Sequence, residues 1–250
     1  MARWLLIILM PLTFSLRAQD APGPDESTLV SRGEQAAVLA REGELGPAER
    51  EYRAVIADAQ RTLGPEKPVT LNFKIALAIV LRVEGKYDEA IKESRDLMHV
   101  LVRVVGPEHG ATMLVWGNLA RSLAGQHKLD EAATVYAAML QVLNRANGAD
   151  HPDTLKARAG RADVLAAQGK LDDADPELRK ILPLMEKSLG KDHPQTLAAT
   201  ASLAKCAKER GRTSEANDLM KRAFESAVKK LGPKHPDTVS YEAQLKQWGL

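Results

Sequence analysis

The stretch LGPEKPVTL, at residues 63–71, decides the fold, because four related stretches follow it at a fixed interval. They are VGPEHGATM (105–113), NGADHPDTL (147–155), LGKDHPQTL (189–197) and LGPKHPDTV (231–239). The glycine of each stretch lies 42 residues after the previous one. A period of about 20 to 50 residues is the signature of a repeat array. Such arrays build long binding surfaces, so the interval favours a binding protein over an enzyme.

One repeat, residues 69–110, has two helical segments. Apolar residues at helical spacing begin near Thr70 and stop at Gly85, and a second such pattern runs from Tyr87 to Val104. A glycine–proline pair then breaks the chain. The predicted unit is therefore a helix, a tight turn, a helix and a loop. One such hairpin cannot bury both of its apolar faces, so it must stack on its neighbours.

The loops carry their own signals. We expect each loop glycine to close a helix, and an Asp or Thr to cap the next one. The turn inside the repeat also has a glycine in four copies, but the third copy has His127 there and Gly125 two residues earlier. We therefore expect a slightly different turn in that copy.

Histidines recur in one register of the loops, at positions 109, 151, 193 and 235. Stacked helix pairs place equivalent atoms about 10 Å or more apart, which is too far for a shared metal. We expect these histidines to stabilise the loops and predict no metal site.

Alanines form two further columns, twelve positions apart in each repeat. They are Ala36, Ala78, Ala120, Ala162 and Ala204 in the first helix, and Ala48, Ala90, Ala132, Ala174 and Ala216 in the second. Two helices approach closely only where both carry small residues. These columns are expected to mark the helix crossings and to serve packing alone.

The composition sets limits on function. Net charge is +2, and no basic run favours nucleic acid as a partner. The single cysteine, Cys206, lies beside alanines and is expected to be a small buried residue, not a nucleophile. The sequence contains no nucleophile elbow, Walker or dinucleotide-binding pattern. We therefore predict no enzyme activity, no cofactor and no small-molecule substrate.

The first 24 residues differ from the rest. Residues 4–16 are a short apolar run between Arg3 and Arg17, too short to span a bilayer, which takes about 20 residues. One interpretation is a signal peptide cleaved after Ala18 or Ser15, and the other is an uncleaved segment lying in the membrane interface. Ala-Pro-Gly-Pro at 21–24 reads as a linker, and residues 25–250 as the repeat domain.

The segments GKYDEA (85–90), HKLDEA (127–132) and GKLDDA (169–174), with the loops quoted above, resemble the tetratricopeptide repeat of the kinesin light chain type. The resemblance covers about residues 28–248. It implies an all-α, right-handed superhelix of five 42-residue helix pairs, beginning near 28, 69, 111, 153 and 195, with a C-terminal capping helix at about 237–248.

In that family the first helix of each pair lines a concave groove that binds protein partners. Position by position, the resemblance implies a groove that contains Asn72, Ile79, Arg82, Asn118, Arg121, Lys156, Asp163, Lys205 and Lys208. Kinesin light chains contact the backbone of a cargo peptide through asparagines of an L-N-N-L-A stretch. Here the matching stretch is WGNLA at 116–120, which keeps only Asn118. Eukaryotic-type cargo recognition is therefore in doubt.

Two functions remain open. In its size and short apolar N-terminus the chain is similar to bacterial members of the family, which accompany bacterial tubulins. This implies an adaptor that links a tubulin filament to the membrane. The alternative is an exported periplasmic scaffold of an envelope or secretion complex. Residues 25–61 are net acidic and residues 205–250 net basic, which could steer an oriented encounter with an acidic surface or could equally be ordinary solvation.

Overall fold

The computed structural model describes residues 23–250, which form eleven α-helices and no strand. The helices are α1 (Glu26–Arg41), α2 (Leu45–Thr62), α3 (Pro68–Val83), α4 (Tyr87–Val104), α5 (Gly110–Gly125), α6 (Leu129–Asn147), α7 (Pro152–Ala167), α8 (Leu171–Ser188), α9 (Pro194–Glu209), α10 (Thr213–Leu231) and α11 (Pro236–Gln247). They form five pairs and a lone last helix, which confirms the predicted solenoid. The predicted signal or membrane segment lies outside the described residues.

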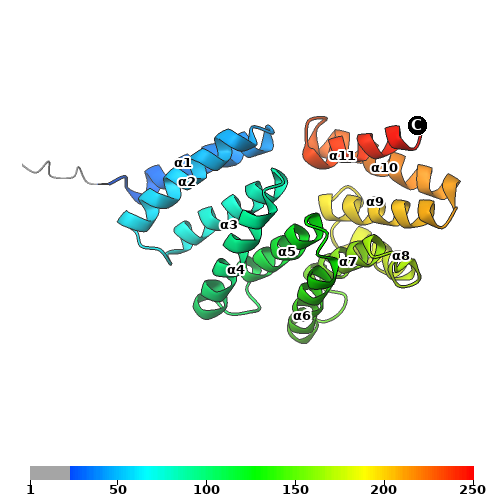
Figure 1. Ribbon diagram of the computed structural model, residues 1–250, viewed down its shortest axis with the longest axis horizontal. Coiled ribbons are helices and arrows are strands. Elements are labelled where there is room, and N and C mark those ends of the chain that lie inside the picture. Colours follow the sequence, from blue (N-terminus) through cyan, green and yellow to red (C-terminus); the bar gives the residue numbers. More distant parts are fainter. Residues whose placement is uncertain (1–22) are drawn as a thin grey trace, which may run out of the picture.

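The pairs follow one another along a curved array, with the first pair and α11 at its two ends (Figure 1). Helices α3, α5, α7 and α9 lie on the inner side of the curve, and α4, α6, α8 and α10 on the outer side. Between residues 23 and 250, no helix combines the length and the apolar character needed to cross a bilayer.

Both alanine columns are buried, with at most 1% of any of their side chains exposed. Leucines such as Leu81, Leu123 and Leu178 pack beside them and are equally buried. The columns are therefore the helix crossings that the sequence predicts. Cys206 is also buried, and burial raises the pKa of its thiol to about 11, so it is a packing residue as expected.

The loops differ from the prediction in what caps the helices. The residue before α5, α7, α9 and α11 is a histidine whose Nδ1 accepts a hydrogen bond from the backbone N–H two residues on, at 3.2 Å. The expected Asp or Thr cap is wrong at these four positions. The hydroxyls of Thr70 and Thr112 instead donate to the carbonyls of Gly64 and Gly106. The prediction that the histidines stabilise the loops is confirmed.

The turn of the third copy is not different. His127 adopts a positive φ of 61°, in the region that glycine occupies in the other copies. Gly125 serves another purpose: a Cβ there would lie 2.4 Å from the ring of Tyr87. The glycine therefore makes room for a neighbouring aromatic side chain, and the expected alternative turn is wrong.

Candidate functional site

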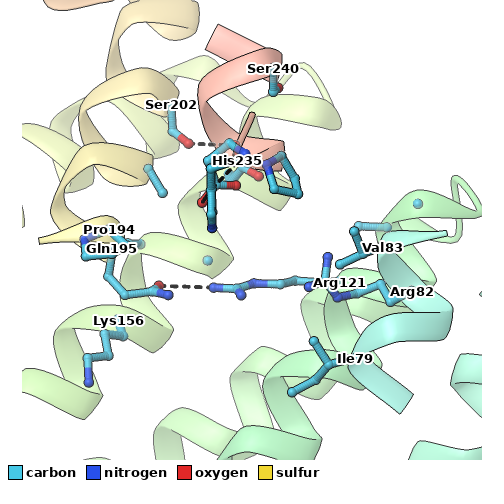
Figure 2. Close-up of a pocket in the computed structure, with 18 of the residues that line it drawn as sticks. Ile79, Arg82, Val83, Arg121, Lys156, Pro194, Gln195, Ser202, His235 and Ser240 are labelled. Atoms are coloured by element: carbon cyan, nitrogen blue, oxygen red, sulfur yellow. Dashed lines mark hydrogen bonds and ion pairs between the residues drawn. The ribbon is translucent and has the colours of Figure 1, made fainter. Parts of the chain in front are cut away.

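The inner side of the curve lines an open-sided cavity of about 740 Å³. Side chains of α3, α5, α7 and α9 form most of its wall, as in Figure 2. Ala40 and Arg41 of α1 border it at one end of the array, and His235 and Pro236 at the start of α11 border it at the other. The two ends of the solenoid thus share one cavity, because the array curves back on itself.

Five of the nine residues predicted for the groove line this cavity. They are Ile79, Arg82, Arg121, Lys156 and Asp163, drawn from α3, α5 and α7. The structure thus brings these five residues together in the central part of the cavity wall.

Asn118 lies in the floor of the same region, but its amide is already occupied. It is 5% exposed, and its Nδ2 donates to the Ala78 carbonyl and to Ser94 Oγ. Its Oδ1 accepts a hydrogen bond of 2.8 Å from Nε of Arg82. Asn118 thus joins α5 to α3 and α4 and holds the Arg82 guanidinium in place.

Three predicted residues do not reach the cavity. Asn72 is exposed on α3, seven residues before Ile79, the first residue of that helix in the cavity wall. Lys205 is exposed elsewhere on α9, and the ammonium of Lys208 lies over the ring of Trp248, 5.0 Å from its centre. Lys208 is therefore engaged at the C-terminal end of α11 and not in the cavity.

Four basic side chains line the cavity, namely Arg41, Arg82, Arg121 and Lys156. Arg121 extends from α5 toward α9, where it donates to Oε1 of Gln195 at 3.1 Å (Figure 2). Within residues 23–250, neither Arg121 nor Arg82 has a carboxylate within 4.0 Å, although fourteen other Arg or Lys side chains form ion pairs. Burial, together with the positive charge of Arg121, lowers the pKa of Arg82 from its usual value.

Two carboxylates, one on α7 and one on α11, also line the cavity. Asp163 of α7 accepts a hydrogen bond of 2.8 Å from the hydroxyl of Ser202. Asp237 of α11 lies 3.8 Å from Nδ1 of His235. In the described part of the chain, neither is paired with a lysine or an arginine. The sequence patterns did not point to Asp237 or Gln195, because the capping helix and the start of α9 enter the cavity only through the curvature of the whole array.

A second, apolar pocket of about 460 Å³ opens from the same wall. Ile79, Met113, Leu114 and Met139 line it, and it shares Arg82, Arg121 and Lys156 with the main cavity. A Cβ added at Gly117 would meet nothing within 4 Å, so the pocket has free space at that point. Apolar and charged surfaces are therefore adjacent in one site.

The described residues contain no group of three or more His, Cys, Asp or Glu side chains that could hold a metal. What the cavity offers is hydrogen-bonding side chains, separate charges and an apolar pocket. Those are the features of a site that binds another molecule.

The family model of the tetratricopeptide repeat matches residues 111–187 and 159–227. Residues 111–227 therefore consist of tetratricopeptide repeats. A search of curated proteins finds no significant match.

Several solved structures share this fold at low sequence identity. A kinesin light chain with nearly identical repeats, from Podosopora anserina, has a TM-score of 0.62 at 23% identity, covering 81% of this chain and 96% of the other. BtubC (BKLC) from P. vanneervenii has a TM-score of 0.58 at 14% identity, covering 81% and 90%. Bacillus thuringiensis PlcR, solved with the peptide PapR7 and DNA, has a TM-score of 0.58 at 13% identity, covering 88% and 74%.

Proposed function

We propose that this protein is a non-catalytic scaffold that binds a peptide in its concave cavity. Repeats of this fold are in general protein-interaction scaffolds. The observation that carries the proposal is the cavity itself. There Arg82 and Arg121, which have no carboxylate partner among the described residues, lie next to an apolar pocket. A peptide offers both carboxylates and apolar side chains. The peptide in the PlcR structure is a precedent for this fold.

The test is capture from an extract of the native organism on the immobilised protein, read by mass spectrometry that detects both proteins and peptides. The double variant Arg121→Glu with Lys156→Glu reverses two charges of the cavity wall. Its control, Lys205→Glu with Arg161→Glu, reverses two exposed charges on α9 and α7 that do not line the cavity.

We expect the cavity variant to lose the captured molecules about tenfold or more, since charged hydrogen bonds are worth about 1.5–3 kcal/mol each. The control should retain them. Equal capture by both variants would place the binding surface on the outer helices or the loops, and the proposal would be wrong.

We further propose that the first 18 residues decide where the scaffold acts. An uncleaved segment supports an adaptor at the cytoplasmic face of the membrane, where a bacterial tubulin filament is the candidate partner. A cleaved segment supports an exported periplasmic scaffold. The mass of the mature N-terminus distinguishes them: a chain that begins near Gln19 contradicts the filament adaptor, and an intact N-terminus in the membrane fraction contradicts export.

A further inference from the structure

The two ends of the array border the same open-sided cavity. Arg41, the last residue of α1, lines it from the first helix pair, and Asp237, in the first turn of α11, lines it from the other end. In Figure 1 the C-terminal end of α1 points toward the loop that precedes α11. The turn after α1, residues 42–44, and the loop before α11, residues 232–235, are therefore the segments that approach each other if the array curves further.

The turn after α1 occupies a position that binds a neighbour elsewhere in the array. Glu42 caps the C-terminus of α1, and the residues that cap α5, α7 and α9 each donate to an aspartate of the preceding helix pair. These bonds join Gln126 to Asp88 at 2.5 Å, Gln168 to Asp130 at 2.8 Å and Arg210 to Asp172 at 2.7 Å. No helix pair precedes α1 in the described chain. Glu42 and Arg41 are exposed there, and neither has an oppositely charged group within 4.0 Å.

The loop before α11 carries a charge of the opposite sign to the earlier loops at one position. The four earlier loops have an acidic residue there, namely Glu66, Glu108, Asp150 and Asp192. The last loop has Lys234 instead, directly before His235 of the cavity wall. Lys234 is exposed, and within residues 23–250 no carboxylate lies within 4.0 Å of its ammonium. The two ends thus carry complementary charges that have no partner in this form of the molecule.

The architecture of the array allows its ends to approach. Extensive contacts join each helix only to its near neighbours, so the curvature is the sum of small rotations between successive helix pairs. A small added rotation at each interface moves the two ends much further than it moves any one pair. The separation of the ends is therefore the dimension of the molecule that weak attractions change most easily.

We propose that the two ends form an electrostatic latch that closes the array around the cavity. In the closed form Glu42 pairs with Lys234, and Arg41 pairs with Asp237. The cavity then has a continuous wall, and a molecule enters or leaves it only when the latch opens. Exposed ion pairs are weak and are screened by salt, so the protein exchanges between the open and the closed form. This inference concerns the protein alone and holds whatever molecule the cavity binds.

The separation of the two ends in the full chain tests the latch. Nitroxide labels are attached to Gln35→Cys on α1 and Ala243→Cys on α11, both at exposed positions, while the buried Cys206 stays unlabelled. Double electron–electron resonance then gives the distribution of distances between the labels. We expect two populations at about 20 mM salt, and the one with the shorter separation should fall about threefold or more at about 1 M salt, where charges are screened beyond about 3 Å.

Charge reversals identify the side chains of the latch. Glu42→Lys and Lys234→Glu each replace an attraction by a repulsion, so each should reduce the population with the shorter separation about threefold or more at low salt. The double variant Glu42→Lys with Lys234→Glu has opposite charges again and should recover that population. Arg50→Glu on α2 and Lys221→Glu on α10 are the controls. They reverse exposed charges at the same two ends of the array, away from the cavity, and should leave the distribution unchanged.

Four results would overturn the latch. One is a single separation that does not respond to salt, and another is a distribution that neither single variant changes. A loss in the controls as large as in the latch variants would show a general attraction between an acidic and a basic end, without specific pairs. If both single variants lose the shorter separation and the double variant does not regain it, Glu42 and Lys234 do not pair. None of these results bears on whether the cavity binds a peptide.

Discussion

At the residue scale, single side chains stabilise the array at two kinds of position. The imidazole before each of α5, α7, α9 and α11 caps that helix through Nδ1. The buried amide of Asn118 connects three helices and an arginine of the cavity wall. Each makes a prediction about stability.

The cap at His193 should make the protein sensitive to acid. Burial, with a contribution from the positive charge of Lys156, lowers the pKa of this imidazole in the folded chain. The stability supplied by the neutral cap is therefore complete above the unfolded pKa of about 6.5 and is lost as the pH falls through the lower folded value. We expect the urea midpoint to fall less between about pH 7 and pH 5 in His193→Asn, because asparagine caps helices without titrating. An identical decline in both proteins would contradict this role.

Asn118 should matter much more for stability than the other predicted asparagine. Asn118→Ala removes three hydrogen bonds and leaves the partly buried Arg82 without its acceptor, so we expect a loss of about 2–3 kcal/mol. Asn72→Ala, at an exposed position, should change the free energy of unfolding by less than about 0.5 kcal/mol. Urea unfolding of both variants measures the difference, and similar losses would mean that the amide network adds no stability.

At the element scale, the helix pairs are connected by a ladder of ion pairs between successive outer helices. Arg53 pairs with Glu89, Arg95 with Glu131 and Arg179 with Glu215, each joining residues 36 positions apart. At the corresponding place between α6 and α8, the repeat has Ala137 opposite Asp173. The ladder therefore lacks one pair, near the middle of the array.

Ala137→Arg should restore this pair. Both positions are accessible to solvent, so the expected gain is small, about 0.2–1 kcal/mol, and should fade at high salt because exposed pairs are screened. The change in melting temperature at low and at high salt measures it. The double variant Ala137→Arg with Asp173→Asn is the control, and the same gain in that background would show that the effect comes from the longer side chain and not from the charge.

The sequence predicts the bounds of the helices well, because the pattern repeats. It predicts poorly the contacts between side chains that belong to different repeats. The 42-residue interval locates all eleven helices to within about two residues, since glycine, proline and the alanine columns act within one hairpin. The interval does not reveal that the Asn118 amide forms hydrogen bonds within the protein, because Ala78 and Ser94 come close to it only when neighbouring repeats pack together. It also cannot place Lys208 against Trp248, or Asp237 in the cavity, since both depend on where the curvature brings α11.

At the scale of the whole molecule, the curvature of the array creates the site, because no single repeat contains it. The wall combines α1 with α11, which are separated by almost the full length of the chain. Function should therefore depend on the space inside the curve, and filling that space is a direct way to probe it.

Gly117→Leu should block the apolar pocket without unfolding the protein. A Cβ at this position meets no atom within 4 Å, and leucine favours the helix more than glycine does. We expect stability to be unchanged or raised, while binding of captured peptides falls about tenfold or more. Ala138→Leu, which adds a leucine at an exposed site on α6, is the matched control and should bind normally. Full binding by Gly117→Leu would exclude the pocket from the site.

The central claim is that the partner occupies the inside of the curve, and site-specific photo-crosslinking in the native organism tests it most directly. A photoreactive residue placed at Gln195, in the cavity wall, is compared with one at Lys92, exposed on the outer helix α4. The account predicts a crosslinked peptide or protein at position 195 and none at position 92, with the adduct at 195 lost when Arg121→Glu and Lys156→Glu are added. Adducts that form at position 92 alone, or that persist at 195 after both charges are reversed, would contradict it.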